Sequence, residues 1–326
     1  MRLRILILFA FAFPFLTGWG HWGPQVKIGF ALGDGKGREA LVKSLKDEME
    51  DNRADLLIKD AKGDSAVQES QVKDLIAQGI QALIVLPVDP KKAGPLVEVA
   101  HQAGIKVVSL ESQIPDSPLD YLIDFNGFKA GELQAKAMVK KVPRGRYVLL
   151  GSDPNLRKGQ MMALQPLIDK GDIRIVASRV SKGNAPEMAK EMMAILKAGG
   201  NKVDAVLAGN SQTAQGAAQA LAQAGLAEKV PVAGVSGDLG TCQRIHSGAQ
   251  ALTVYDPLPK LAEEAAYLTA KVARNAKQFD CQFTEMPNET GTTLAVLLTP
   301  IVVDAKNLDS TIIQDGVQKR EEVYGK

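Results

Sequence analysis

Eight short apolar runs recur along the chain, and small or short polar residues (Gly, Asp, Asn or Ser) cluster where they end. Helix-like stretches separate most of them. The apolar runs have no polar side, which is typical of parallel strands buried on both faces. The pattern therefore predicts an open α/β architecture with its polar groups at the strand ends, where ligands of such sheets bind. The runs lie at 28–35, 56–64, 83–89, 107–112, 148–153, 206–211, 232–238 and 252–256.

The stretches between the runs carry apolar residues at helical spacing. In 36–52, for example, Leu41, Leu45 and Met49 share one side and charged residues occupy the other. Alternation of strands with amphipathic helices predicts doubly wound parallel sheets covered by helices. The other expected helices lie at 65–78, 95–103, 131–141, 186–198, 213–224 and 258–277.

A weak internal repeat relates 79–112 to 201–238. Each copy reads strand, polar turn, helix and strand, and Gly104 and Gly225 suit the left-handed position that ends a helix. We therefore expect two lobes, one from 25–125 plus 257–288 and the other from 126–256 plus 289–326. The three crossovers are expected near 123–126, 254–259 and 288–294, where few residues would act as hinges.

The first twenty residues differ from the rest of the chain. Arg2 and Arg4 precede an apolar run at 5–16, and small residues follow it. This order is typical of a secretory signal peptide, and the run is short for a membrane-spanning helix. The alternative is an uncleaved membrane anchor. Both predict a folded part outside the cytoplasm, periplasmic or secreted.

Composition excludes several classes of function. The 326 residues are 45% hydrophobic and 23% charged, with a net charge of +2 and scattered basic residues. These values are typical of a globular protein and argue against nucleic acid as a partner. The two cysteines, Cys242 and Cys281, have no metal-site spacing, and their pairing stays open. The three histidines are isolated, so we expect no metal and no cofactor.

The glycine-rich turn at 33–37 follows a strand but matches neither phosphate-binding motif. GxxxxGK[ST] and GxGxxG both fail, because Lys36 is followed by Gly and position 38 is Arg. Asp34 and Lys36 either face a cleft or lie in a solvated turn. At the other strand ends, Asp89 is expected to cap the helix that follows it, and Ser211 is preferred over Asn210 as the cap of the helix at 213–224.

Catalysis is not expected. The chain has no G-x-S-x-G elbow and no H-E-x-x-H motif. Four carboxylates could converge at the strand ends, and such groups also hold sugar hydroxyls by charge-assisted hydrogen bonds. They are Asp34, Glu111, Asp238 and Asp256.

Segments over nearly the whole chain after the leader resemble the periplasmic sugar-binding proteins of ABC transporters, of the ribose-binding-like class. The similarity is greatest to the D-xylose-binding members. It is carried by VKIGFAL (26–32), QGIQALIVLP (78–87), GIKVVSLES (104–112), GELQAKAMVKKVPRGRYVLLGS (131–152), KGQMMALQPLIDKGDIRIV (158–176), KVDAVLAGNSQTAQGAAQAL (202–221), ALTVYDPL (251–258) and LLTPIVVDAKNLDSTIIQDG (297–316).

The resemblance implies two lobes that close on a small ligand, and it implies a set of ligand contacts. Several positions depart from the family pattern. Lys36 replaces an Arg, Glu111-Ser112 an Asp-Arg pair, Asn184 a stacking Trp, Ser236 an Asp and Asp256 a Lys, while Asn155 and Asn210 are kept. The implied contacts are Asp34, Lys36, Glu111, Asn155, Asn184, Asn210, Ser236 and Asp256.

Together these observations predict a non-enzymatic solute-binding protein. Its ligand would be a small polar molecule, a monosaccharide or polyol, and its partner the membrane permease of an ABC transporter. The alternative is a ligand-sensing subunit for a membrane sensor kinase or chemoreceptor. The changed positions count against xylose as the ligand and leave its identity open.

Overall fold

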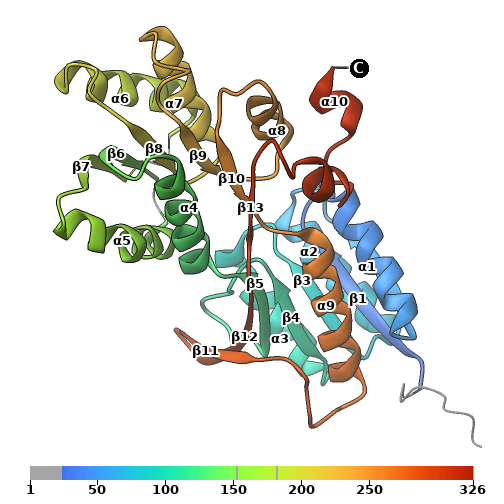
Figure 1. Cartoon of the computed structure of the whole chain (residues 1–326). Helices are drawn as coiled ribbons and strands as arrows, with labels where there is room; N and C mark the ends of the chain where they lie inside the picture. The colour runs from blue at the N-terminus through green and yellow to red at the C-terminus, as the bar shows by residue number, and fades with distance from the viewer. Residues whose placement is uncertain (1–23, 152, 181–182, 326) are drawn as a thin grey trace, which may run out of the picture.

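Two α/β lobes make up the molecule, one at the lower right and one at the upper left of Figure 1. The computed structural model describes residues 24–151, 153–180 and 183–325, so the predicted signal peptide at 1–20 lies outside the described residues. Within these ranges the strand order is β11-β12-β5-β4-β3-β1-β2 in one sheet and β13-β10-β9-β8-β6-β7 in the other. The pairs β11–β12 and β10–β13 are antiparallel, and the remaining pairs are parallel. The predicted fold class is confirmed.

In the first lobe, α1 and α9 cover one face of the sheet, and α2 and α3 cover the other. Alternate residues of each central strand join the two cores, as the period of a strand requires. The strands are β1 (Val26–Leu32), β2 (Ala54–Asp60), β3 (Ala82–Leu86), β4 (Lys106–Leu110), β5 (Tyr121–Phe125), β11 (Phe283–Asn288) and β12 (Gly291–Leu298); the helices are α1 (Glu39–Asp51), α2 (Ser65–Ala77), α3 (Gly94–Gln102) and α9 (Leu258–Ala273).

In the second lobe, α6 and α7 cover one face, α4 and α5 the other, and α8 and α10 pack near β13. The strands are β6 (Gly145–Leu150), β7 (Ile173–Arg179), β8 (Ala205–Ala208), β9 (Val232–Val235), β10 (Leu252–Tyr255) and β13 (Ile301–Val303); the helices are α4 (Gly127–Lys141), α5 (Pro154–Asp169), α6 (Ala185–Ala198), α7 (Ser211–Gln223), α8 (Leu239–His246) and α10 (Arg320–Tyr324).

Local signals in the sequence account for much of this architecture. Helix α1 buries Leu41, Leu45 and Met49, as its periodicity predicts. Gly104 and Gly225 have φ angles of 72° and 67°, which confirms their predicted left-handed conformation after α3 and α7.

Two buried glutamines occupy comparable places in the two lobes. In α2, Gln68 points inward, where its Nε2 donates to the carbonyls of Ala31 and Leu86 at 3.0 and 2.9 Å. In α4, Gln134 Nε2 donates to the carbonyls of Ala208 and Gly234 at 2.8 and 3.0 Å. Each glutamine satisfies carbonyls near the ends of two strands, where an apolar side chain would leave them unpaired.

Three crossovers join the lobes. The chain passes from β5 into α4, from β10 into α9, and from β12 into β13. The third crossover was predicted at 288–294, which is wrong: these residues form the β11–β12 hairpin, and Leu294–Leu298 pair with Tyr121–Phe125 of the first sheet. Residues 289–298 therefore belong to the first lobe. The Asn126 N–H donates to the Leu298 carbonyl at 2.8 Å and links two of the crossovers.

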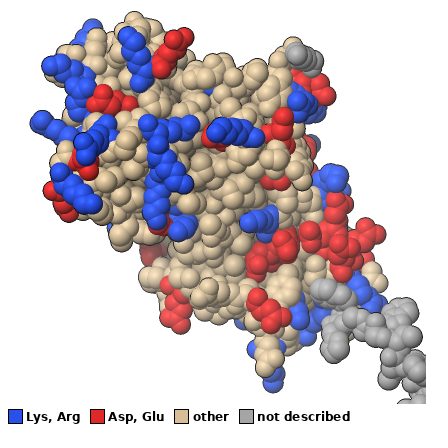
Figure 2. Space-filling model, in the orientation of Figure 1, with Lys and Arg blue, Asp and Glu red and all other residues tan. Residues whose placement is uncertain are grey.

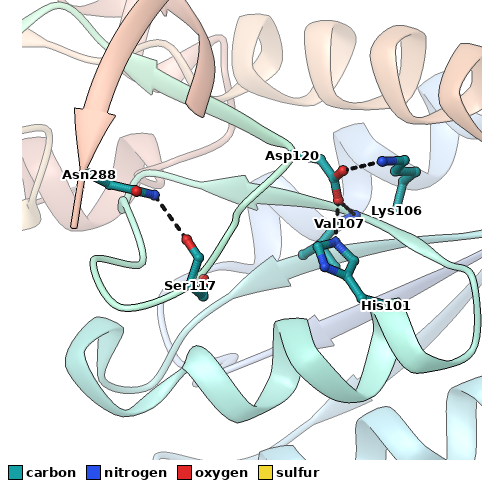
Figure 3. A network of polar contacts seen from close by, with 6 residues as sticks. All are labelled: His101, Lys106, Val107, Ser117, Asp120 and Asn288. Carbon is teal, nitrogen blue, oxygen red and sulfur yellow. Dashed lines mark hydrogen bonds and ion pairs between the residues drawn. The ribbon is translucent and has the colours of Figure 1, made fainter. Parts of the chain in front are cut away.

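A polar network ties the β11–β12 hairpin and α3 to the loop that precedes β5 (Figure 3). Asp120 lies 2.7 Å from His101 Nε2 and 2.6 Å from Lys106 Nζ, and it also accepts a backbone N–H of β4. The hydrogen bond and charge of Asp120 raise the pKa of Lys106. Asn288 Nδ2 donates to the Ser117 carbonyl at 2.9 Å. These contacts stabilise the end of the first sheet that lies opposite the crossovers.

The surface carries both signs of charge. In Figure 2, Lys and Arg side chains gather over the second lobe, and acidic side chains gather at the lower right, over the first. In α1, burial and the neighbouring Glu263, Asp51 and Asp47 raise the pKa of Glu48. Cys242 and Cys281 are both free thiols. Across the described ranges, the helices lack the length and apolar character needed to cross a membrane.

Candidate ligand-binding site between the lobes

A cavity of about 600 Å³ lies between the lobes, where strands of both sheets end. Another hollow, of about 510 Å³, lies over α6 and α7, but helix residues alone line it. We therefore take the cavity at the strand ends as the candidate site. Its main polar and aromatic lining is Arg38, Glu111, Asp124 and Phe125 on the first lobe and Ser236, Asp238, Tyr255 and Asp256 on the second.

Arg38 and Glu111 form a two-pronged ion pair at the wall of the cavity. Arg38 Nη1 and Nη2 donate to the two Glu111 carboxylate oxygens at 2.8 and 2.6 Å. Arg38 is the residue before α1, and Glu111 follows β4 with a left-handed φ of 58°. Such a backbone conformation is unusual for a residue other than glycine. The pair fixes both side chains in one plane.

Asp124 and Asp256 lie at two of the three crossovers. Asp124 is near the end of β5 and accepts the Phe125 N–H at 2.7 Å, and Asp256 directly follows β10. Burial, together with the neighbouring Asp124 and Glu111, raises the pKa of Asp256 to about 7. Burial also raises the pKa of Asp124 to about 7; its backbone hydrogen bond opposes the shift, and nearby Glu111 adds to it. The two carboxyls therefore share an acidic environment.

Asp238 has a different environment from these two carboxyls. It caps α8 by accepting the Thr241 N–H at 2.7 Å, and its own N–H donates to Ser236 Oγ at 3.0 Å. Burial would raise the pKa of Asp238, but hydrogen bonds from Ser211 and Thr241 and the charge of Arg244 lower it overall. Asp238 is therefore a carboxylate with a nearby cation.

Two aromatic side chains give the cavity its apolar walls. Tyr255 packs in the core of the second lobe and its hydroxyl donates to Asp315 Oδ2 at 3.0 Å. Phe125 ends β5 on the opposite side. Phe30 of β1 is fully buried in the first core and does not line the cavity. Phe125 and Tyr255 thus form the aromatic part of the cavity wall.

Three of the eight expected contacts, Glu111, Ser236 and Asp256, line the cavity. Local backbone structure accounts for the others, which lie outside its lining. Asp34 accepts the Lys36 N–H at 3.0 Å in an exposed turn. Exposed Asn155 lies in the first turn of α5, exposed Asn184 caps α6 by accepting the Glu187 N–H, and Asn210 caps α7 by accepting the Thr213 N–H.

The expectation that Ser211 caps α7 is wrong. Asn210 is the cap, and the Ser211 hydroxyl lies 3.2 Å from Thr241 Oγ1. Asp89 does cap the 3₁₀ turn that follows it, as predicted.

Two charged residues of the cavity lining, Arg38 and Asp124, were missed from the sequence. Asp124 carried a weak signal, because YLIDF is an apolar run with an acid near its end. Arg38 carried none, since its partner Glu111 is 73 residues away.

Comparisons with known proteins identify the family of the chain. A model of the periplasmic binding protein domain matches residues 28–277. The chain belongs to the periplasmic binding protein family. A D-xylose-binding periplasmic protein of Escherichia coli K12 is 35% identical over 99% of this chain and 100% of its own length. One from Haemophilus influenzae is 36% identical over 92% of each chain. The resemblance stated from the sequence is confirmed.

Solved structures support the fold of this periplasmic binding protein. An arabinose-binding protein from Geobacillus stearothermophilus superposes with a TM-score of 0.74 at 17% identity, covering 89% of this chain and 99% of the other. A carbohydrate transporter solute-binding protein from Chloroflexus aurantiacus, in complex with D-glucose, has a TM-score of 0.71 at 22% identity, covering 91% and 97%. The family and its full-length relatives confirm the expected periplasmic location.

Proposed function

We propose that this periplasmic binding protein closes its lobes on a small polar ligand, a monosaccharide or related polyol. The closed form would then dock on the permease of an ABC transporter. The observation that carries the proposal is the inter-lobe cavity, which receives polar side chains from strand ends of both sheets. Its volume of about 600 Å³ is in the usual range for small-molecule sites.

The relatives support a ligand of this class. Those with full-length similarity are named for D-xylose, and the structural neighbour from Chloroflexus aurantiacus holds D-glucose. The family is one of solute-binding proteins, and we propose that this chain likewise binds without catalysing a reaction. A ligand that contacts both lobes favours the closed state by the difference in its affinity for the two states.

Within the cavity we propose Glu111, Ser236 and Asp256 as ligand contacts, joined by Arg38 and Asp124. Asn210 is a further proposed contact on closure. Its side-chain oxygen accepts the cap hydrogen bond, while its amide nitrogen donates to no group among the described residues. We assign turn and capping roles to Asp34, Lys36, Asn155 and Asn184.

The proposal is tested by binding and compaction together. The protein is unfolded and refolded to remove bound ligand, then titrated with pentoses, hexoses and polyols. A true ligand should raise the unfolding temperature by mass action and reduce the radius of gyration in X-ray scattering. Ser236→Trp, which fills the cavity, should abolish both effects. Ser70→Trp, on the exposed side of α2, should keep them. The proposal fails if no compound in the panel changes either quantity.

A further inference from the structure

The charges that line the inter-lobe cavity are unbalanced. Four carboxyl groups face it, and Arg38 is the single basic residue in the lining of the described chain. The cavity is the candidate ligand site because of its position between the two sheets and the family of the chain. Its carboxyl groups concern a separate question, which is the chemical class of ligand that it accepts.

The nearby cations are already engaged. Both terminal nitrogens of Arg38 donate to Glu111. Arg244 lies beside Asp238 and donates to Thr241 Oγ1 at 3.0 Å. Neither guanidinium takes part in a hydrogen bond or ion pair with Asp124 or Asp256 in the described part of the chain.

Asp124 and Asp256 are thus surrounded by groups of their own sign. Asp256 experiences the charges of Asp124 and Glu111, and it has no hydrogen bond or ion pair among the described residues. Asp124 has one backbone hydrogen bond and experiences the charges of Glu111 and Asp153. The other titratable neighbours, Tyr255 and Asp315, add no positive charge. A positive charge placed between the two carboxyl groups would relieve both repulsions at once.

A metal ion does not fit this arrangement. Across the described ranges, no three His, Cys, Asp or Glu side chains are grouped as metal ligands. The volume of about 600 Å³ is that of an organic molecule, and Ser236 and Gln318 provide neutral polar contacts for its hydroxyls. An ammonium group on a polyol skeleton matches both features.

We propose that the preferred ligand carries an ammonium group on a monosaccharide-sized polyol, with that group held between Asp124 and Asp256. The proposal rests on the proposed function and narrows its ligand class. Because Asp124 lies near the end of a strand of the first sheet and Asp256 directly follows a strand of the second, the ammonium group would bridge the lobes and favour closure.

The test compares matched ligands by calorimetry on the refolded full chain at pH 8. Xylitol is paired with 1-amino-1-deoxyxylitol, sorbitol with 1-amino-1-deoxysorbitol, and glucose with 2-amino-2-deoxyglucose. We expect at least one amine to bind tenfold or more tightly than its neutral partner. N-acetylation of that amine, which removes the charge, should remove the preference. The two alkylamines stay protonated at both pH 6 and pH 8. Their advantage over the neutral partners should be severalfold smaller at pH 6 than at pH 8, because Asp124 and Asp256 take up protons at the lower pH.

Variants locate the effect. Asp124→Asn and Asp256→Asn should each reduce the preference for the amine tenfold or more. Glu98→Gln removes an exposed charge on α3 and should leave the preference unchanged. If neutral compounds bind as tightly as their amine partners at pH 8, the inference is wrong and the proposed function stands. If neither series binds, both are wrong. The ligand and pH comparisons use the unmodified chain, so they do not depend on how the variants fold.

Discussion

Replacing Asp256 by Asn should stabilise the ligand-free protein, and the gain should grow with pH. The pKa of Asp256 is about 7 in the folded protein, against an ordinary value of 3.8. The folded state therefore holds this proton more tightly than the unfolded state. The contribution of the group to stability is full below pH 4, falls as pH rises, and is lost above pH 7.

The structure sets the size of this effect. A difference of about 3 pKa units at about 1.36 kcal/mol each gives an upper limit of about 4 kcal/mol at pH 8. Burial is the largest cause of the shift, and a buried Asn amide also loses contact with water. We therefore expect a net gain of about 2 kcal/mol at pH 8 and little change at pH 5, where the protonated acid and the amide are both neutral.

Urea unfolding of the refolded protein at pH 5 and pH 8 measures this difference, with Glu98→Gln as the control for net charge. The reasoning is refuted if Asp256→Asn is no more stable than the parent at pH 8, or if it gains equally at both pH values. A positive result would mean that burial of the Asp256 carboxylate, together with repulsion from its acidic neighbours, lowers stability at the proposed ligand site, as is common for functional sites.

Three further outcomes follow from other contacts. Arg38→Met leaves Glu111 without its ion-pair partner at a partly buried site and should lower the free energy of unfolding by about 1 kcal/mol, measured in urea at pH 7. Gly131→Ala places a methyl group against the Leu156 backbone carbonyl of α5, so it should lower the free energy of unfolding by about 3 kcal/mol or more. Thermal unfolding measures this change, with Gly94→Ala as the matched control because its new carbon meets nothing closer than 3.5 Å. Asn210→Ala should lose the α7 cap, about 1 kcal/mol, whereas Asn210→Asp should keep it and weaken ligand binding; unchanged binding in both variants would remove Asn210 from the proposed contacts.

Much of the fold could be predicted because it depends on local patterns. Helix α1 follows from the spacing of its apolar residues, and the ends of α3 and α7 follow from Gly104 and Gly225. The third crossover could not be placed this way. The β11–β12 hairpin joins the first sheet by pairing with β5, which is about 170 residues earlier, and no local pattern specifies that partner.

The candidate site was predicted only in part for a related reason. Polar residues at strand ends include ligand contacts, helix caps and turn residues, and all three use the same residue types. Asn184 and Asn210 resemble ligand contacts in the sequence, but both cap helices in the structure.

The amino-acid sequence by itself determined the architecture, the family and the strand ends at which polar groups gather. These features depend on the spacing of apolar residues and on turn residues, which act over short distances along the chain. Only the tertiary structure decided which of those groups meet. It brought Arg38 to Glu111 and placed Asp124 near Asp256, through pairings between segments 73 and 132 residues apart. The charge balance of the cavity depends on which distant side chains share it, and for that reason only the folded chain reveals it.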